Sequence, residues 1–232
     1  MRYVVSDIHG NYDLLVKLLK KIKFSKNDTL FVLGDVIDKG KEVDRLLNLL
    51  LIEMENNAVV LAGNHEYDFI KAMTNLIAKD ASDKELVETA KIYLGLPSIS
   101  IEQIDMIMNL NYYHEEDDFI LVHAGVPFDI KGNPIPLEQA PIEDLVYDRR
   151  FKNENFLPPN TKCVIFGHTP TFYIQGKKGK IIKYQKPNTV GNSPKDYYKI
   201  HIDTGNYLTG ILGCVCLDDM QEFYVSEFED WG

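Results

Sequence analysis

The sequence predicts an α/β fold in a single domain, and three observations carry this prediction. Short runs rich in β-branched residues alternate with amphipathic stretches in the first half of the chain. With 232 residues, 45% of them hydrophobic, the chain is long enough to bury a core without disulfide bonds. No internal repeat, low-complexity segment or Pro/Gly/Ser-rich linker divides it. We therefore expect one domain over residues 1–232.

The first half supplies three strands and two helices. The strands are expected at residues 3–5, 30–33 and 58–61. After the first strand, Asn11 is a suitable N-cap for a helix whose apolar face comprises Leu14, Leu15, Leu18, Leu19 and Ile22. A second helix is expected over residues 43–55.

Residues 66–110 change character and predict a helical insertion over one side of the core. Ser82 with Glu85, and Ser100 with Gln103, have the spacing of capping boxes and mark two helix starts. The rest of the chain returns to strands at residues 119–122, 163–166, 199–202 and 212–217.

A Lys-rich stretch at residues 176–186 looks like a hairpin and contains Lys177, Lys178, Lys180, Lys183 and Lys186. It could guide an anionic substrate or simply be solvated. We favour the solvated hairpin, because lysine is common at exposed sheet edges, where it prevents edge-to-edge pairing.

Composition excludes several classes of protein. Acidic residues outnumber Lys plus Arg by 35 to 25, and the net charge of −10 argues against nucleic acid or an anionic membrane as partner. No apolar run reaches membrane-spanning length, and the N-terminus lacks the apolar core of a signal peptide. Cys163, Cys214 and Cys216 are expected to be small buried hydrophobes in a reduced compartment. We therefore expect a cytoplasmic protein.

Five of the expected strands end in a polar cluster. The clusters occupy residues 6–10, 34–40, 62–66, 123–125 and 167–170. Loops converge and ligands bind at the carboxyl ends of strands in α/β sheets. The clusters therefore predict one shared site, although they are far apart in the sequence.

Four of the six histidines lie in these clusters, each within two residues of a glycine: His9, His65, His123 and His168. A lone histidine in such a position is more often structural than a ligand. Four in the same context, beside glycines that leave room for a ligand, favour a site. His114 and His201 lack this context and are interpreted as structural.

The side chains in the clusters favour a pair of metal ions. Asp7 and Asp35 offer carboxylates and Asn64 an amide oxygen, and imidazoles come from His9, His123 and His168. Calcium sites avoid imidazole and structural zinc sites use thiolates, whereas mixed nitrogen and oxygen ligands suit manganese, iron or zinc. Six ligands are too many for one tetrahedral ion. They suit two ions about 3.5–4 Å apart, which can stabilise both the attacking and the leaving oxygen at phosphorus.

Other phosphate chemistries lack their residues. A cysteine phosphatase needs Arg six positions after its Cys, where this chain has Thr169, Met220 and Glu222. No two aspartates are separated by one residue, as an aspartyl-phosphate enzyme requires. Neither a Gly-x-x-x-x-Gly-Lys loop nor a Gly-x-Gly-x-x-Gly turn is present.

The ordered motifs Asp-x-His-Gly, Gly-Asp-x-x-Asp-x-Gly, Gly-Asn-His-Glu, His-Ala-Gly and Gly-His-Thr resemble the phosphoprotein phosphatase family of calcineurin-like metallophosphoesterases. The most similar branch holds phage and bacterial Ser/Thr phosphatases and diadenosine tetraphosphatases. The motifs run from residue 6 to residue 168, and residues 202–205 with Gly210 look like the branch's C-terminal signature. The resemblance implies a β-sandwich flanked by helices, with the site at the strand ends.

The resemblance also implies roles for individual residues. Asp7 and His9 would hold the first metal, Asp35 would bridge, and the second metal would be held by Asn64, His123 and His168. A hydroxide between the ions would be the nucleophile. His65 would be the general acid, oriented by Asp38, and Asp203 would be a carboxylate near the metals. Manganese is the expected metal, with iron and zinc as alternatives.

Two positions depart from the family pattern. Lys39 and Ala62 stand where an arginine is usual, and lysine offers a point charge instead of a bidentate fork. Arg149, which follows Tyr147 by two positions, matches the family's phosphate-binding arginine, with Arg150 as its competitor. We expect Arg149 and Lys39 to bind the substrate.

Three functions remain open at this point. The first choice is a Ser/Thr-type protein phosphatase acting on a phosphorylated protein or peptide. The alternative is a hydrolase of diadenosine polyphosphates or other small phosphoesters, for which the helical insertion and the missing arginines leave room. An inactive regulatory or binding module ranks last, because every expected metal ligand and the acid histidine are present.

Overall fold

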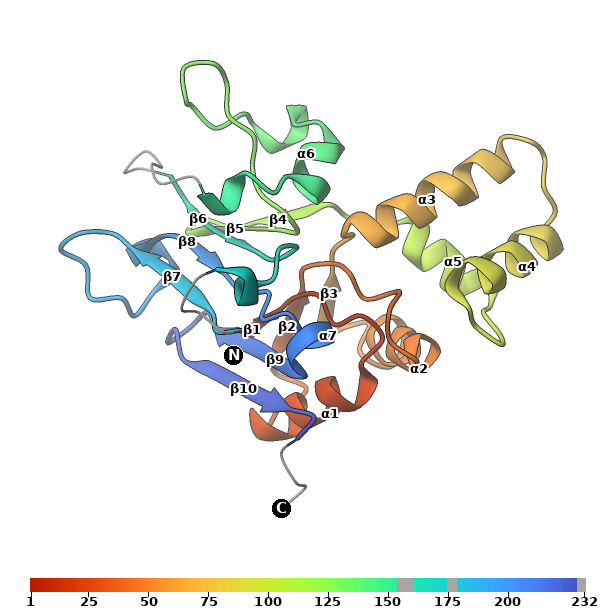
Figure 1. Cartoon of the computed structure of the whole chain (residues 1–232), viewed down its shortest axis with the longest axis horizontal. Helices are drawn as coiled ribbons and strands as arrows, with labels where there is room; N and C mark the ends of the chain where they lie inside the picture. Colours follow the sequence, from red (N-terminus) through yellow and green to blue (C-terminus); the bar gives the residue numbers. More distant parts are fainter. Residues whose placement is uncertain (154–160, 175–178, 229–232) are drawn as a thin grey trace.

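Two five-stranded sheets pack face to face in this protein, as shown by a computed structural model that describes residues 1–153, 161–174 and 179–228 (Figure 1). The first sheet has the order β10-β9-β1-β2-β3. Its strands are β1 (Arg2–Val5), β2 (Thr29–Val32), β3 (Ala58–Val60), β9 (Ile211–Cys216) and β10 (Glu222–Ser226). β1, β2 and β3 run parallel, whereas β9 and β10 are antiparallel to their neighbours.

The second sheet has the order β4-β5-β6-β8-β7. Its strands are β4 (Tyr113–Glu115), β5 (Phe119–Val122), β6 (Cys163–Phe166), β7 (Ile182–Gln185) and β8 (Tyr197–His201). Here β5, β6 and β8 run parallel, with antiparallel β4 and β7 at the edges. Each sheet therefore contains three parallel strands whose carboxyl ends lie along one edge. Five of these six ends carry the polar clusters, and the sixth, that of β8, leads into residues 202–205.

Alternation along the strands divides the core into layers. Val4 of β1 and Phe31 of β2 face the second sheet, and Leu121 of β5 and Ile165 of β6 face back towards them. The neighbours of these residues on each strand point to the outer faces. Cys214 and Cys216 share the outer face of β9, and their burial agrees with the prediction of small buried hydrophobes.

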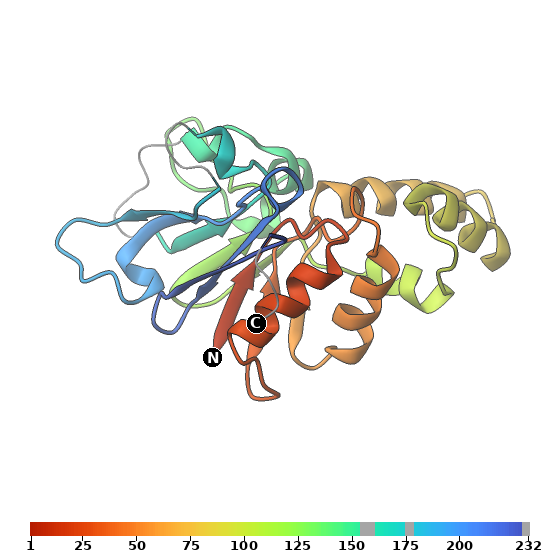
Figure 2. The same cartoon turned by 60° about the horizontal axis from the view of Figure 1, so that its bottom comes forward.

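Helices cover the outer face of the first sheet (Figure 2). α1 (Tyr12–Lys21) begins after Asn11, whose side chain accepts a hydrogen bond from the Leu14 amide as predicted. The second expected helix forms as α2 (Val43–Leu47) and continues as the π-helix η1 (Asn48–Glu53).

Three helices form an arm beside the sheets: α3 (Asn64–Ile77), α4 (Asp83–Leu94) and α5 (Ile101–Met108) (Figures 1 and 2). Both predicted capping boxes are present, at Ser82 and at Ser100. α3 begins at Asn64, two residues earlier than expected. Asn64 therefore opens a helix and does not lie in an extended segment after β3.

The remaining elements are short. They are α6 (Ile142–Tyr147), α7 (Asn206–Thr209) and the 3₁₀ turns η2 (Leu137–Gln139), η3 (Phe151–Asn153), η4 (Thr171–Tyr173) and η5 (Pro194–Asp196). In the Lys-rich stretch, Lys177 and Lys178 lie outside the described residues. The described part forms β7, which pairs with β8. No helix in the described ranges is both long enough and apolar enough to cross a membrane.

Candidate metal centre

The loops that carry the polar clusters have an unusual backbone. Ten residues other than glycine have positive φ angles in the described part of the chain, and six of them lie in these loops. Left-handed backbone costs energy in residues with a Cβ, and it is found where a site fixes the position of a side chain. The six residues are Asp7, His9, Asp35, Asp38, Lys39 and His168.

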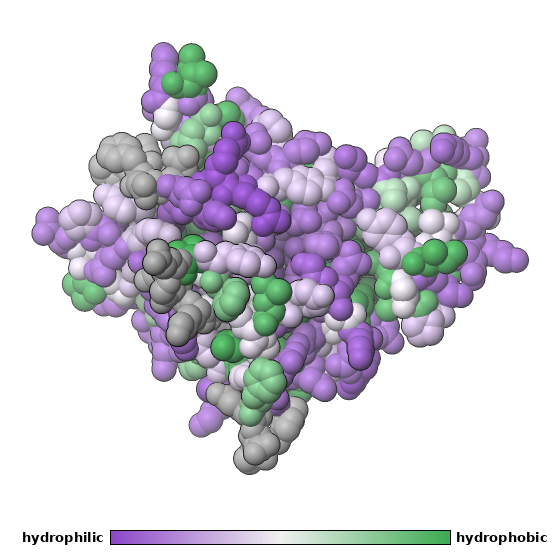
Figure 3. Space-filling model, in the orientation of Figure 1, coloured by the Kyte–Doolittle hydropathy of each residue, from purple (hydrophilic) through white to green (hydrophobic). Residues whose placement is uncertain are grey.

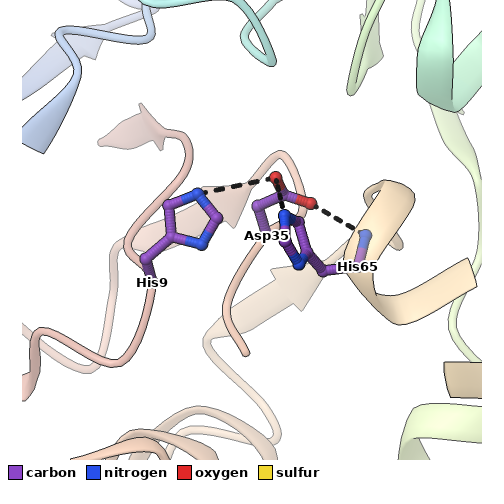
Figure 4. Close-up of side chains that lie close together, drawn as sticks. All are labelled: His9, Asp35 and His65. Atoms are coloured by element: carbon purple, nitrogen blue, oxygen red, sulfur yellow. Dashed lines mark hydrogen bonds and ion pairs between the residues drawn. The ribbon is translucent and has the colours of Figure 1, made fainter. Parts of the chain in front are cut away.

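Asp35 lies at the centre of two groups of potential ligands. One group is Asp35 with His9 and His65, and the other is Asp35 with His123 and His168. Within each group the ligand atoms lie within 4.8 Å of one another. Figure 4 shows the first group, with His9 and His65 on either side of the carboxylate.

The two oxygens of Asp35 face different groups. Oδ2 lies 3.6 Å from His9 Nε2 and 3.7 Å from His65 Nε2. Oδ1 lies 3.4 Å from His123 Nε2. A carboxylate that offers one oxygen to each of two ligand groups has the arrangement expected of a bridging ligand.

Asn64 and Asp7 lie next to these groups. Asn64 Oδ1 is 3.2 Å from His123 Nε2, and that nitrogen is also 3.1 Å from His168 Nδ1. Asp7 Oδ2 accepts a hydrogen bond of 3.0 Å from the His168 amide and another from the Ser6 hydroxyl. The structure thus brings all six expected ligand residues to one place, from loops of both sheets.

The electrostatics of the cluster fit bound cations. Burial, and then the charges of Asp7 and Glu66, raise the pKa of Asp35 well above its ordinary value. Burial and the charge of Asp7 also raise the pKa of Asp203 well above its ordinary value. Buried carboxylates this close together are stabilised by positive charge between them.

The imidazoles of the cluster are in the form that binds metals. Burial lowers the pKa of His9 to about 4 and that of His168 to about 3, so both rings are neutral at neutral pH. Metals bind neutral imidazole. In addition, His168 Nε2 is buried and has no hydrogen-bond partner among the described residues. The mixed carboxylate, amide and imidazole donors therefore fit divalent transition metals.

His65 is held by Asp38. Its Nδ1 lies 2.6 Å from Asp38 Oδ2, and its Nε2 faces Asp35. Burial lowers the pKa of His65, but the hydrogen bond to Asp38 and the charge of Asp35 outweigh this effect and leave the pKa above its ordinary value. His65 can therefore carry a proton at the edge of the ligand groups.

The two arginines considered for phosphate binding lie in different surroundings. Arg149 lines the same pocket as Asp7 and His168, and its Nη1 lies 3.4 Å from the Thr169 hydroxyl. Arg150 lines another pocket, and its Nε pairs with Asp148 at 3.0 Å.

Lys39 lies within the ligand cluster itself. Its Nζ is 2.8 Å from His9 Nε2 and 5.6 Å from the centre of the Tyr207 ring. It also lines the pocket that contains Arg149. Among the described residues, Lys39 is the only cationic side chain that bonds a ligand nitrogen, and it does so in the first ligand group.

Glu66 is a residue of this centre that was not predicted. Its buried carboxylate accepts hydrogen bonds from four backbone amides, those of Asp35, Val36, Ile37 and Gly63, at 2.8–3.0 Å. It thereby ties the loop after β2 to the start of α3. The signal lies in the sequence, because glutamate at the third position of a helix often bonds back to the N-cap amide.

The C-terminal signature also reaches the centre. The Asn206 side chain donates to the backbone carbonyl of Asp7, and Asp203 Oδ1 accepts a 2.7 Å hydrogen bond from the Gly205 amide. Asn206 was not predicted, since a side chain that bonds a distant backbone carbonyl leaves no pattern in the sequence.

The two histidines interpreted as structural lie outside the ligand groups. His201 Nε2 is 2.6 Å from the Thr169 carbonyl oxygen, and its ring stacks on Phe166. His114 Nε2 is 3.3 Å from a carboxylate oxygen of Glu116.

A pocket of about 260 Å³ opens beside the ligands. Residues of the N-terminal loops, Arg149 and the C-terminal signature line it together. Its lining comprises Asp7, His9, Lys39, Arg149, His168, Pro170, Tyr173, Asp203, Gly205, Asn206, Tyr207 and Leu208.

Known proteins are similar to this chain in sequence and in fold. A symmetrical bis(5'-nucleosyl)-tetraphosphatase from Vibrio vulnificus (strain CMCP6) is 30% identical over 164 residues, which cover 69% of this chain and 56% of the relative. The matched region spans about half the length of such curated relatives.

Two solved structures share the fold. A protein described as a candidate diadenosine tetraphosphatase superposes with a TM-score of 0.67 at 18% identity, over 99% of this chain and 94% of that one. A serine/threonine protein phosphatase from Saccharomyces cerevisiae gives 0.56 at 18% identity, over 100% and 81%. At this identity both show the metallophosphoesterase fold, as predicted, and do not choose between substrates.

The family model of the calcineurin-like phosphoesterases matches residues 2–191, which include the expected metal ligands and both arginines. The match extends over most of the chain and agrees with the two-sheet architecture and the converging ligand loops. The chain therefore belongs to the calcineurin-like phosphoesterase family.

Proposed function

We propose that this protein is a metal-dependent phosphoester hydrolase whose substrates are dinucleoside polyphosphates. The observation that carries the proposal is the pair of ligand groups joined by Asp35, which suits two metals acting on one phosphorus. The sequence relatives are named as symmetrical bis(5'-nucleosyl)-tetraphosphatases, which favours a small polyphosphate over a phosphoprotein. The alternative from the sequence thus has more support than the Ser/Thr phosphatase that ranked first.

Six residues would hold two divalent ions: Asp7, His9, Asp35, Asn64, His123 and His168. When bound, the ions would supply positive charge to the phosphoryl oxygens and lower the pKa of an attacking water. Manganese is our first choice because it accepts carboxylate, amide and imidazole ligands together, and iron and zinc accept the same set.

His65 would donate a proton to the departing oxygen. Asp38 at Nδ1 fixes the ring orientation and favours the protonated form, so that Nε2 is the nitrogen that faces the reaction. A positioned general acid of this kind lowers the barrier most when the leaving group is poor.

Arg149 and Lys39 would hold the phosphate chain. Both line the pocket beside the ligands, and a guanidinium can pair with two phosphoryl oxygens at once. The ammonium of Lys39 adds a point charge near His9.

A substrate screen tests the proposal. Purified protein loaded with Mn²⁺ should release product from diadenosine tetraphosphate with a higher kcat/KM than from a phosphoserine peptide or an aryl phosphate. A higher kcat/KM on the phosphopeptide would restore the Ser/Thr phosphatase. No hydrolysis of any of the three would overturn the proposed activity.

A further inference from the structure

Exposed aromatic side chains border the metal centre on one side. Tyr207 of α7 and Tyr173 of η4 line the same pocket as His9 and His168. Tyr207 is 59% exposed and Tyr173 is 65% exposed. Neither hydroxyl has a hydrogen-bond partner among the residues that the structure describes. We call these two rings the tyrosine wall.

Tyr207 is held close to the metal ligands by its neighbours in the chain. The neighbour of Tyr207, Asn206, is tied to the Asp7 carbonyl, and Gly205 has a left-handed backbone with φ of 70°. The Tyr207 ring centre lies 6.5 Å from that of His9. The Tyr207 ring is thus positioned beside a loop that carries a metal ligand.

The surroundings of the tyrosine wall are apolar on an otherwise hydrophilic face. Figure 3 shows hydrophobic surface gathered around η4 and α7, whereas most of this face is hydrophilic. Leu208, which is 48% exposed, and Pro170 line the pocket beside the two tyrosines. Phosphate gains nothing from such a surface, since it binds to charge and to hydrogen-bond donors. A flat apolar group that is attached to the phosphate would gain binding energy from this surface.

Nucleobases bind in this way. A base stacks on an aromatic side chain through its face, and every base has such a face. Arg149 and Lys39, which suit phosphates, line the same pocket, and Lys39 Nζ lies 5.6 Å from the centre of the Tyr207 ring. One pocket thus combines cationic groups for phosphate with aromatic rings for a base.

We propose that Tyr207 and Tyr173 bind the nucleobase of a nucleotide by stacking while its phosphates lie at the metal centre. This inference rests on the proposed function, because it names how that site selects a nucleoside over a plain phosphoester. Selection then comes from the aromatic rings and not from the metal ligands.

Binding of a matched pair of ligands to the Mn²⁺-loaded protein tests the inference. AMP and ribose 5-phosphate differ only in the base, so the ratio of their dissociation constants by titration calorimetry isolates its contribution. AMP should bind about 5- to 150-fold more tightly, as expected for one stacked base. The ratio should fall in Tyr207→Ala and in Tyr173→Ala, approach one in the double variant, and persist in Tyr207→Phe, which keeps the ring.

Phe228→Ala is the matched control. Phe228 is an exposed aromatic residue, 82% exposed, but it does not line the pocket, so its loss should leave the ratio unchanged. Unchanged binding of ribose 5-phosphate to each variant reports an intact centre. A ratio near one in the wild type, or a full ratio in the double variant, overturns the inference.

The proposed function can fail separately. Hydrolysis of phosphopeptide in preference to diadenosine tetraphosphate would remove the proposed substrate, while the AMP ratio would still decide whether the tyrosine wall binds a base.

Discussion

His65 could be either a metal ligand or the general acid of this centre. It lies with His9 and Asp35 in a ligand group, yet Asp38 holds its Nδ1 and raises its pKa. A ligand would be needed for every substrate, whereas a general acid matters in proportion to how poor the leaving group is.

We predict that His65→Asn keeps both metals and loses about 10²–10⁴ in rate on an alkyl phosphate. On a nitrophenyl ester, whose leaving group needs little protonation, the loss should be much smaller. Asn64→Ala is the comparison, because loss of a ligand should weaken the second metal and damage both substrates alike. Rates on both esters and metal content decide the outcome. An equal loss on both esters with a metal missing from His65→Asn would make His65 a ligand.

Arg149 and Arg150 form a natural matched pair of variants. Arg149→Ala should lower kcat/KM by about 10²–10³, by analogy with the removal of one donor from an oxyanion hole. Arg150→Ala should have little effect, because its guanidinium pairs with Asp148 outside the pocket. Lys39→Ala should fall between the two, since an ammonium cannot pair with two oxygens. A crippled Arg150→Ala with a mild Arg149→Ala would reverse the assignment.

At the scale of elements, the buried strands were easier to predict than the edge strands and the π-helical turn. Residues 119–122 and 163–166 form strands with the predicted bounds, because these four-residue apolar runs contain β-branched residues and are too short for a helix. β4 and β10 were not predicted. β4 has three half-buried or exposed residues, and β10 has one buried residue, so neither has a clear hydrophobic pattern. The π-helical turn η1 keeps the apolar spacing of a helix and cannot be distinguished from it by sequence.

Glu66 shows how an element terminus supports the centre. Four amides converge on its carboxylate, three of them from the loop that carries Asp35. In Glu66→Gln, an amide NH₂ would replace one acceptor oxygen and leave buried N–H groups without partners. We expect the free energy of unfolding to fall by about 1–3 kcal/mol per unpaired group, together with weaker metal binding.

Glu85→Gln is the control for this change. Glu85 also stands at the third position of a helix and accepts from the N-cap amide of Ser82, but it lies in the arm away from the ligands. Glu85→Gln should lower thermal stability much less than Glu66→Gln and should leave the metal content unchanged. Equal effects in both variants would show that Glu66 acts only as a helix cap.

At the scale of the whole molecule, the site depends on contacts that no local pattern encodes. Asp7 bonds the amide of His168, 161 residues away, and Asn206 bonds Asp7 across 199 residues. Strand ends and residue types were enough to predict which side chains gather. The sequence does not show which strands pair, so the division of the parallel strands into β1, β2 and β3 of one sheet and β5, β6 and β8 of the other was not predicted. The arm helices share the core cluster of β1 and α1. This shared core supports our prediction that residues 1–232 form one domain.

The metal centre also links activity to global stability. Asp7, Asp35 and Asp203 are buried together, and burial opposes their charge. Metal ions that bind only the folded state would stabilise it, by about 2.7 kcal/mol at a free concentration 100 times the dissociation constant. For a chain of this length, such a gain raises Tm by roughly 5–10 °C.

Dialysis against a chelator should therefore abolish hydrolysis and lower Tm, and Mn²⁺ should restore both. Asp35→Asn should remove the rise in Tm, because the carboxylate shared by the two ligand groups is lost. Asp13→Asn is the matched control, since Asp13 is an exposed acid of α1 outside the centre and its loss should leave the Mn²⁺-dependent rise intact. Thermal unfolding and phosphate release, measured on the same samples, give both readouts. Full activity in protein shown to be free of metal would contradict the two-metal assignment, even if Mn²⁺ raised Tm.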